Sequence, residues 1–185
     1  MKICDNYVSY DVAKDLYEKH KRCIWCGKYV ELGKRGVDWS VDHTIPFSVA
    51  RWCASLFPEK YDYGCLVYHL SRKRNLSIMH PWCNKKKGDY VFNPMTLKSQ
   101  SNMSNTQMRK YRELYEDVRE VMDDYMSFKK DIFYKQKKKC YLCKTKTDIN
   151  SMTLRRIRCC EPASAENACA ICPGCVIYHK TSSET

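Results

Sequence analysis

Two short stretches of the sequence contain residue types that could carry out metal-assisted hydrolysis. Asp42 and His43 are adjacent within residues 41–46, and Asn84 directly follows Cys83 in a Cys-Asn-x2-Lys-Gly-Asp motif. A histidine of ordinary pKa, near 6.5, offers a neutral imidazole that can accept a proton from water. Carboxylate and amide oxygens are suitable ligands for a hard divalent cation. We therefore expect a metal-dependent site that cleaves phosphodiester bonds.

Pairs of cysteine and histidine at ligand spacing lie next to these residues and recur near the end of the chain. The thirteen cysteines are an odd number, and residues 1–6 turn polar too early for a signal peptide, so a reducing compartment and metal ligation are expected rather than disulfides. Two structural zinc ions are predicted, with four protein ligands each and no open position for catalysis. The expected ligands are Cys23, Cys26, His80 and Cys83 for the first zinc, and Cys140, Cys143, Cys172 and Cys175 for the second.

Alternatives remain open at both zinc sites. At the first, His69 could replace His80. At the second, other thiols compete as ligands, namely Cys159, Cys160 and Cys169. Three further cysteines have no partner at ligand spacing and are expected to be core or partly buried residues: Cys4, Cys53 and Cys65.

The two cysteine-rich parts of the chain share a motif that suggests an internal duplication. Residues 75–83 and 167–175 both follow the pattern Asn-x4-ligand-Pro-x-Cys without a gap, and each lies downstream of a Cys-x2-Cys pair. The second copy lacks the Asp-His pair, and Val176 stands where the first copy has Asn84. If the repeat is real, the second copy keeps its metal ligands without the chemistry. Chance similarity between two short zinc knuckles is the alternative.

The charge of the chain favours a polyanionic partner. Its 33 basic and 21 acidic residues give a net charge of +12, and the excess is clustered near the metal motifs. Such clusters bind nucleic acid by displacing its counterions, although each could also be a solvated face. No apolar run is long enough to cross a membrane, so an intracellular location, cytoplasm or nucleus, is expected. The candidate nucleic-acid-binding residues are Arg72, Lys73, Arg74, Lys85, Lys86, Lys87, Lys137, Lys138, Lys139, Arg155, Arg156 and Arg158.

Apolar spacing gives a coarse view of the elements that must position these residues. A short helix is expected over residues 9–21 with Ser9 as N-cap, and a strand pair or turn over 37–47. Residues 48–74 are expected to form a partly helical insertion that closes back at Asn75. Residues 105–135 lack Gly and Pro and predict one helix of roughly 30 residues and 45 Å. Its apolar stripe could pack along the first module or against a twin helix in a homodimer.

The motifs over residues 20–90 resemble the HNH endonuclease family, specifically its zinc-stapled members with a ββα-metal core. The resemblance consists of Cys-x2-Cys, Asp-His-x2-Pro, Asn-Leu-x-x-Met and Cys-Asn-x2-Lys-Gly-Asp in the family's order. It implies that His43 is the general base, that Asp42 and Asn84 bind Mg²⁺ or Mn²⁺, and that Asn75 ties the catalytic loop and orients His43. Lys87 and its neighbours would contact phosphate.

Two positions and one long segment depart from the family pattern. Asn84 stands where many members have His, and His80 stands where many have Cys. The long stretch between Pro46 and Asn75 is the largest departure.

Together these features predict an α+β protein with three parts. Residues 1–98 would form a small zinc-bound ββα-metal (HNH) nuclease module, residues 99–137 a linker and long connecting helix, and residues 138–185 a C-terminal zinc-binding module. The expected function is metal-dependent cleavage of double-stranded DNA, by nicking or double-strand cutting, in a homing, restriction-like or junction-resolving role. Freestanding enzymes of this kind are common in phages, mobile elements and large DNA viruses. The alternative is a non-catalytic zinc protein that binds nucleic acid, such as a transcription or assembly factor.

Overall fold

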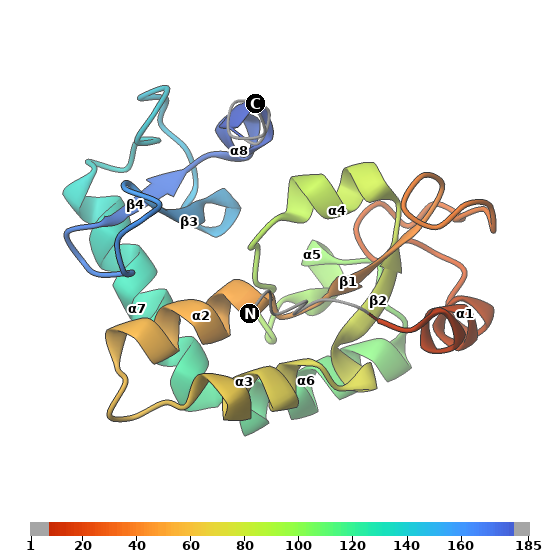
Figure 1. Ribbon diagram of the computed structural model, residues 1–185. Coiled ribbons are helices and arrows are strands. Elements are labelled where there is room, and N and C mark those ends of the chain that lie inside the picture. Colours follow the sequence, from red (N-terminus) through yellow and green to blue (C-terminus); the bar gives the residue numbers. More distant parts are fainter. Residues whose placement is uncertain (1–7, 180–185) are drawn as a thin grey trace.

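The chain has an α+β fold in which two small two-stranded antiparallel sheets are joined by helices. A computed structural model describes residues 8–179, without the side chains of residues 177–179 (Figure 1). The sheets are β1 (Ser40–His43) with β2 (Leu76–Met79), and β3 (Thr153–Arg156) with β4 (Ala168–Ile171). The helices are α1 (Tyr10–Lys19), α2 (Phe47–Leu56), α3 (Tyr63–Leu70), α4 (Pro81–Lys87), α5 (Leu97–Gln100), α6 (Asn105–Asp117), α7 (Arg119–Lys135) and α8 (Pro173–His179), with 3-10 turns η1 (Lys73–Asn75) and η2 (Ile149–Ser151).

The first helix begins where the sequence predicts it. The Ser9 side chain accepts a hydrogen bond from the Val12 amide and caps α1. Ala13, Leu16 and Tyr17 form its buried face. The Tyr17 hydroxyl donates to a backbone carbonyl of the first knuckle at 2.8 Å, so α1 is fixed to the cysteine turn that follows it.

The first sheet is closed by residues that are distant in the sequence. β1 pairs with β2 in the register Ser40 to Met79 and His43 to Leu76. Of the strand pair or turn expected over residues 37–47, one strand is present, and its partner strand follows the insertion. α4 begins directly after β2, with a proline at its first position and glycine at its C-cap. The order strand, strand, helix places one face of β1 against α4.

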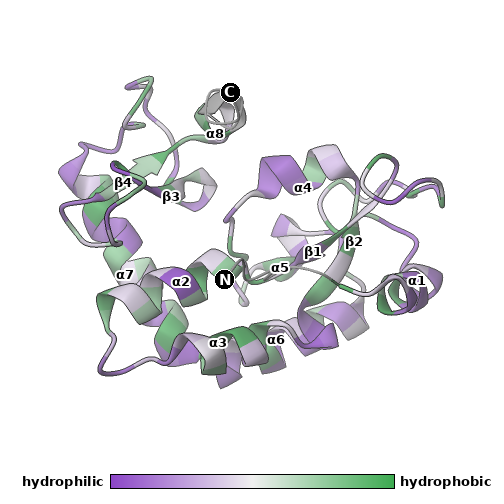
Figure 2. Cartoon of the chain, viewed as in Figure 1, coloured by the Kyte–Doolittle hydropathy of each residue, from purple (hydrophilic) through white to green (hydrophobic). Residues whose placement is uncertain are grey.

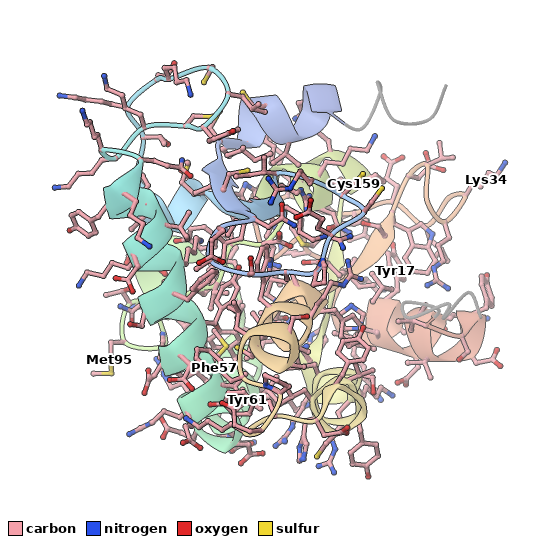
Figure 3. All side chains as sticks on the ribbon, turned by 60° about the vertical axis from the view of Figure 1, so that its left-hand side comes forward. Tyr17, Lys34, Phe57, Tyr61, Met95 and Cys159 are labelled. Atoms are coloured by element: carbon pink, nitrogen blue, oxygen red, sulfur yellow. The ribbon has the colours of Figure 1, made fainter. Side chains whose placement is uncertain are left out.

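The insertion between β1 and β2 is partly helical, as predicted. It contains α2 and α3, which pack against each other, and α2 also packs against α7. Trp52 on α2 and Phe128 on α7 bring their ring centroids to 5.7 Å. Phe57 and Tyr61 lie beside the same helix (Figure 3), where the Tyr61 hydroxyl donates to Asp124 at 2.6 Å. The insertion therefore anchors the first module to α7.

The expected single helix over residues 105–135 is broken in two. α6 ends at Asp117, and Val118 has φ −120° and ψ 22°, outside the helical range, before α7 begins. α6 packs on η1, whereas α7 packs on α2 and β4 (Figure 1). A β-branched residue such as Val118 is a weak helix former. The break there lets the apolar face of α6 and that of α7 pack on different elements. Apolar residues of both helices are buried within the chain, in agreement with the first of the two alternatives considered above.

One continuous core joins the two sheets through α7. Figure 2 shows β4 in apolar colour, whereas α4 is largely polar. The side-chain amide of Gln136, at the end of α7, extends the edge of β4 like a strand partner. Its Oε1 accepts from the Ala170 amide at 2.8 Å, and its Nε2 donates to the Ala170 carbonyl at 2.9 Å. The second module is thus tied to α7 by backbone-like hydrogen bonds.

Candidate metal centres and active site

The first set of predicted zinc ligands converges on one point. The ligand atoms of Cys23, Cys26, His80 and Cys83 all lie within 4.8 Å of one another. His80 Nδ1 lies 3.4 Å from the Cys26 Sγ and 3.9 Å from the Cys83 Sγ. Tetrahedral zinc, with Zn–S near 2.3 Å and Zn–N near 2.1 Å, places sulfur and nitrogen about 3.6 Å apart. The four residues therefore fit a structural zinc ion.

The histidine of this centre is oriented by a backbone carbonyl. His80 Nε2 lies 3.1 Å from the Tyr29 carbonyl oxygen, so a proton on Nε2 leaves the Nδ1 lone pair for the metal. His69, the alternative ligand, lies on α3 and is not part of the cluster. In the cysteine turn, Gly27 has φ +73°, and a Cβ there would lie 2.7 Å from the Asn102 side chain. Glycine adopts this conformation without strain, and its lack of a side chain leaves room for the segment that covers the turn.

The second set of ligands also converges, which removes the ambiguity among the thiols. The sulfur atoms of Cys140, Cys143, Cys172 and Cys175 lie within 4.8 Å of one another. The Cys143 to Cys172 sulfur distance of 3.7 Å matches the edge of a ZnS4 tetrahedron, about 3.8 Å. The competing thiols lie elsewhere: Cys169 is buried in β4, and Cys159 (Figure 3) and Cys160 are exposed on the loop between β3 and β4.

The cysteines outside the two clusters differ in burial. Cys53 is buried in α2 as expected, and burial raises the pKa of its thiol to about 12. Cys65 is exposed on α3, so the expectation that it is a core or partly buried residue is wrong. Cys4 lies outside the described residues.

The two modules share a detailed hydrogen-bond pattern around their repeated asparagines. Asn75 Oδ1 accepts from the Ile45 amide at 2.7 Å, and its Nδ2 donates to the Ile45 carbonyl at 2.9 Å. Asn167 makes the same two bonds to Arg158, at 2.7 and 3.0 Å. The Asn75 carbonyl also accepts from Thr44 at 2.7 Å, and the Asn167 carbonyl from the residue before Arg158 at 2.9 Å. This agreement supports the predicted duplication.

The same correspondence places an arginine pair where the first module has its acid and histidine. Thr153 faces Ile171 across the second sheet as Ser40 faces Met79 across the first. Counting along β3 from this pair puts Arg155 at the position of Asp42 and Arg156 at that of His43. The second module therefore has the ligand turn and strand geometry of the first without its candidate reactive groups.

In the first module, Asp42 faces α4 and forms an ion pair with Lys87, an interaction that the sequence analysis did not predict. Its Oδ2 lies 2.8 Å from Lys87 Nζ, which also donates to the His43 carbonyl at 2.9 Å. The Lys87 side chain is fully buried, so the expectation that it contacts phosphate at the surface is wrong. Its spacing of three residues from Asn84 on one helix could have revealed that both face β1. Burial raises the pKa of the Asp42 carboxyl, and the Lys87 ammonium opposes this.

Asn84 lies on the same side of the sheet as Asp42. Its Nδ2 donates to Ser40 Oγ at 3.4 Å, and Ser40, two residues before Asp42, shares its strand face. The amide nitrogen is thus engaged, and the oxygen is the atom that could ligate a cation. With Asp42 Oδ2 paired to Lys87, Oδ1 is the corresponding carboxylate atom. One carboxylate and one amide oxygen, completed by water, suit Mg²⁺ or Mn²⁺.

His43 lies on the opposite face of β1 from Asp42. Its ring is partly buried against Phe47 at the start of α2, with 4.2 Å between ring centroids. Burial and, to a smaller extent, the positive charge of Lys87 lower the pKa of His43 to about 4. The imidazole is therefore neutral at pH 7. Of the four predicted residues, Asp42 and Asn84 share one face, Asn75 holds the loop as expected, and His43 stands apart on the other face.

The predicted basic residues fall into two groups. Some are held by acids: Lys73 pairs with Asp15, Arg74 with Asp117, Arg155 with Asp89 at 3.6 Å, and Arg158 with Glu161 at 2.5 Å. Others are exposed and free of such pairs within residues 8–179, which leaves them accessible to a polyanion: Arg72, Lys85, Lys86, Lys137, Lys138, Lys139 and Arg156. Lys86 lies 5.5 Å over the ring of Trp82, itself 54% exposed.

A buried lysine on α7 is a charged group that sequence analysis missed. Lys129 is fully buried, and its ammonium has no hydrogen-bond partner among the described residues. Burial lowers its pKa to about 8, although the charges of Asp89 and Asp148 act in the opposite direction. Lys129 falls at a position of the apolar spacing of this helix, and this could have indicated that its side chain is buried.

Comparison of the chain with protein-family models, curated proteins and solved structures gives no match. Within the described part of the chain, no helix combines the length and apolar character needed to span a membrane.

Proposed function

We propose that the chain is a metal-dependent endonuclease of the HNH type that hydrolyses phosphodiester bonds in double-stranded DNA. The observation that carries this proposal is the arrangement of β1, β2 and α4. It sets the Asp42 carboxylate and the Asn84 amide on one side of a zinc-stapled unit, next in sequence to a neutral histidine. The resemblance of residues 20–90 to that family supports the same assignment.

Hydrolysis of a phosphodiester requires that water lose a proton while the 3′-oxygen leaves. His43 is the candidate acceptor of that proton, because its imidazole is neutral at pH 7. Its low pKa makes it a weak base, and a bound phosphate would raise that pKa by its negative charge. Mg²⁺ or Mn²⁺, when bound, supplies positive charge for the phosphate and the leaving oxygen.

The remaining residues position these groups. Lys87 fixes both Asp42 and the His43 carbonyl from α4, so the end of β1 is held at two points. Asn75 bridges the turn after β1 to the end of α3 by its bonds to Ile45 and Leu70. The two zinc clusters would supply folding free energy only, because four protein ligands leave no position for water.

Two observations favour a second candidate, a non-catalytic zinc protein that binds nucleic acid. The Lys87 ammonium neutralises the carboxylate that would attract a cation, and His43 faces away from Asp42. Under this alternative the pair is structural, and the exposed lysines account for binding.

A plasmid-nicking assay distinguishes the two functions. Zinc-loaded wild type should convert supercoiled plasmid to nicked circles only when Mg²⁺ or Mn²⁺ is added. Asp42→Ala and Asn84→Ala should lose this activity at 10 mM Mg²⁺ and keep their affinity for DNA, whereas Lys98→Ala on α5, an exposed site, should cut like wild type. Equal inactivity of all four proteins, with DNA binding retained, supports the binding protein. RNA in place of the plasmid tests the substrate class.

A further inference from the structure

The outer face of the second cysteine turn is uncovered, whereas the equivalent face of the first is covered. In the first turn, Ile24 is fully buried, and its carbonyl accepts from the Asn102 amide at 2.7 Å. Trp25 packs against Tyr90 and Phe92, at 5.4 and 6.1 Å between ring centroids. The equivalent residues of the second turn, Tyr141 and Leu142, are 36% and 38% exposed.

The two turns have the same backbone hydrogen bond, so they differ in the segments that pack on them. The Gly27 amide donates to the Cys23 carbonyl at 2.9 Å, and the Lys144 amide donates to the Cys140 carbonyl at 3.0 Å. Lys144 thus occupies the position of Gly27, with φ +60°. In the first turn a side chain there would clash with Asn102. In the second, a lysine is accommodated in a conformation that L residues rarely adopt, and such strain is often found at functional positions.

Lysine dominates the second turn and its flanks. Residues 134–147 contain six lysines and neither aspartate nor glutamate. Lys139 and Lys146 face each other across the turn in an antiparallel bridge. Lys144 lies 4.8 Å over the ring of Tyr141, and Lys138 lies 4.9 Å over the ring of Tyr134, which is 52% exposed. An exposed apolar and aromatic centre is thus surrounded by ammonium groups.

We propose that this surface, the lysine turn formed by Lys138, Lys139, Tyr141, Leu142, Lys144 and Lys146, binds the phosphate backbone of double-stranded DNA. Its charge is complementary to a polyanion, and its lysines lie on both sides of one cysteine turn. The second module would then act as a docking element at the far end of the chain from α1 (Figure 1). The inference deepens the proposed function but does not require that the chain cut DNA.

The test measures binding of the full-length, zinc-loaded chain to a fluorescent 30-base-pair duplex in magnesium-free buffer, with His43→Ala present throughout to prevent cleavage. The turn variant carries Lys139→Gln, Lys144→Gln and Lys146→Gln. The control carries Lys14→Gln, Lys98→Gln and Lys110→Gln, three lysines exposed elsewhere. The turn variant should bind about 100-fold more weakly at 0.15 M salt and lower the slope of log affinity against log salt by about 3, since each phosphate contact contributes about 0.9.

A single variant separates binding from folding. Lys144→Gly restores the residue of the first turn and relieves a left-handed lysine, so its melting temperature should equal or exceed that of wild type. Its DNA affinity should nevertheless fall about fivefold at 0.15 M salt. Equal affinities of the turn and control variants would overturn the inference, as would capture of the chain by phosphatidylserine vesicles without duplex binding. Lys-dependent duplex binding without any nicking by wild type would refute the nuclease function alone.

Discussion

Asn75→Ala should destabilise the first module strongly, because one buried amide closes the loop that holds the site. Its oxygen accepts from Ile45 at 2.7 Å, and its nitrogen donates to Ile45 at 2.9 Å and to Leu70 at 2.7 Å, in a position with no solvent exposure. Removing the amide leaves three backbone groups buried without partners, each at a cost of about 1 to 3 kcal/mol. We expect a loss of about 4 kcal/mol in the free energy of unfolding.

Denaturant and thermal unfolding in the presence of zinc measure this loss. For a chain of this size, 4 kcal/mol corresponds to a fall of about 12 °C in melting temperature. Asn167→Ala is a matched control, because Asn167 makes the equivalent bonds to Arg158 and a further bond of 2.8 Å to Pro162. Both variants should be destabilised. Nicking, measured well below both melting temperatures, should be lost in Asn75→Ala alone. A loss under 1 kcal/mol for Asn75→Ala, or equal loss of nicking in both, would refute the reasoning.

Three other perturbations test separate parts of the structure. Lys129→Met should raise the free energy of unfolding by about 3 kcal/mol at pH 7, because the folded-state pKa of Lys129, about 8, lies below the ordinary 10.5. Denaturant titrations, with the exposed Lys130→Met as control, should show that this gain shrinks as pH rises through 8 toward 10.5. Destabilisation at pH 7 would contradict the prediction. Metal analysis should find two zinc ions per chain and one in Cys143→Ser, and a chelator should unfold the wild type; full folding without zinc would contradict this. Lys87→Met should cost about 3 kcal/mol by leaving the partly buried Asp42 carboxylate without its cation. An unchanged midpoint of unfolding would show that the ion pair contributes nothing.

The sequence predicted the parts of the site that depend on local spacing. Cysteine pairs two residues apart form a turn by themselves, so both ligand sets could be named, and the shared motif around Asn75 and Asn167 pointed to the repeat. The Ser9 cap and the helical insertion were equally local signals. Each of these features is set by a few neighbouring residues.

Features that depend on tertiary packing were missed. The pairing of β1 with β2 spans the insertion, and no local pattern near His43 indicated its partner strand. The break at Val118 arises because α6 and α7 pack on different elements, which an uninterrupted apolar spacing does not reveal. Lys87 was expected to contact phosphate because it belongs to a basic cluster and because of the family resemblance, whereas its ion pair with the partly buried Asp42 carboxylate decides its place.

Chemical rescue of His43→Ala tests the central claim most directly. The reaction is single-turnover cleavage of an end-labelled duplex with Mg²⁺ present. Wild type should cut, the variant should be slower by at least 100-fold, and free imidazole at tens of millimolar should restore cutting to the variant without accelerating wild type. Cleavage by the variant at the wild-type rate, or a wild type that does not cut with Mg²⁺ or Mn²⁺ while it binds the duplex, would contradict the account.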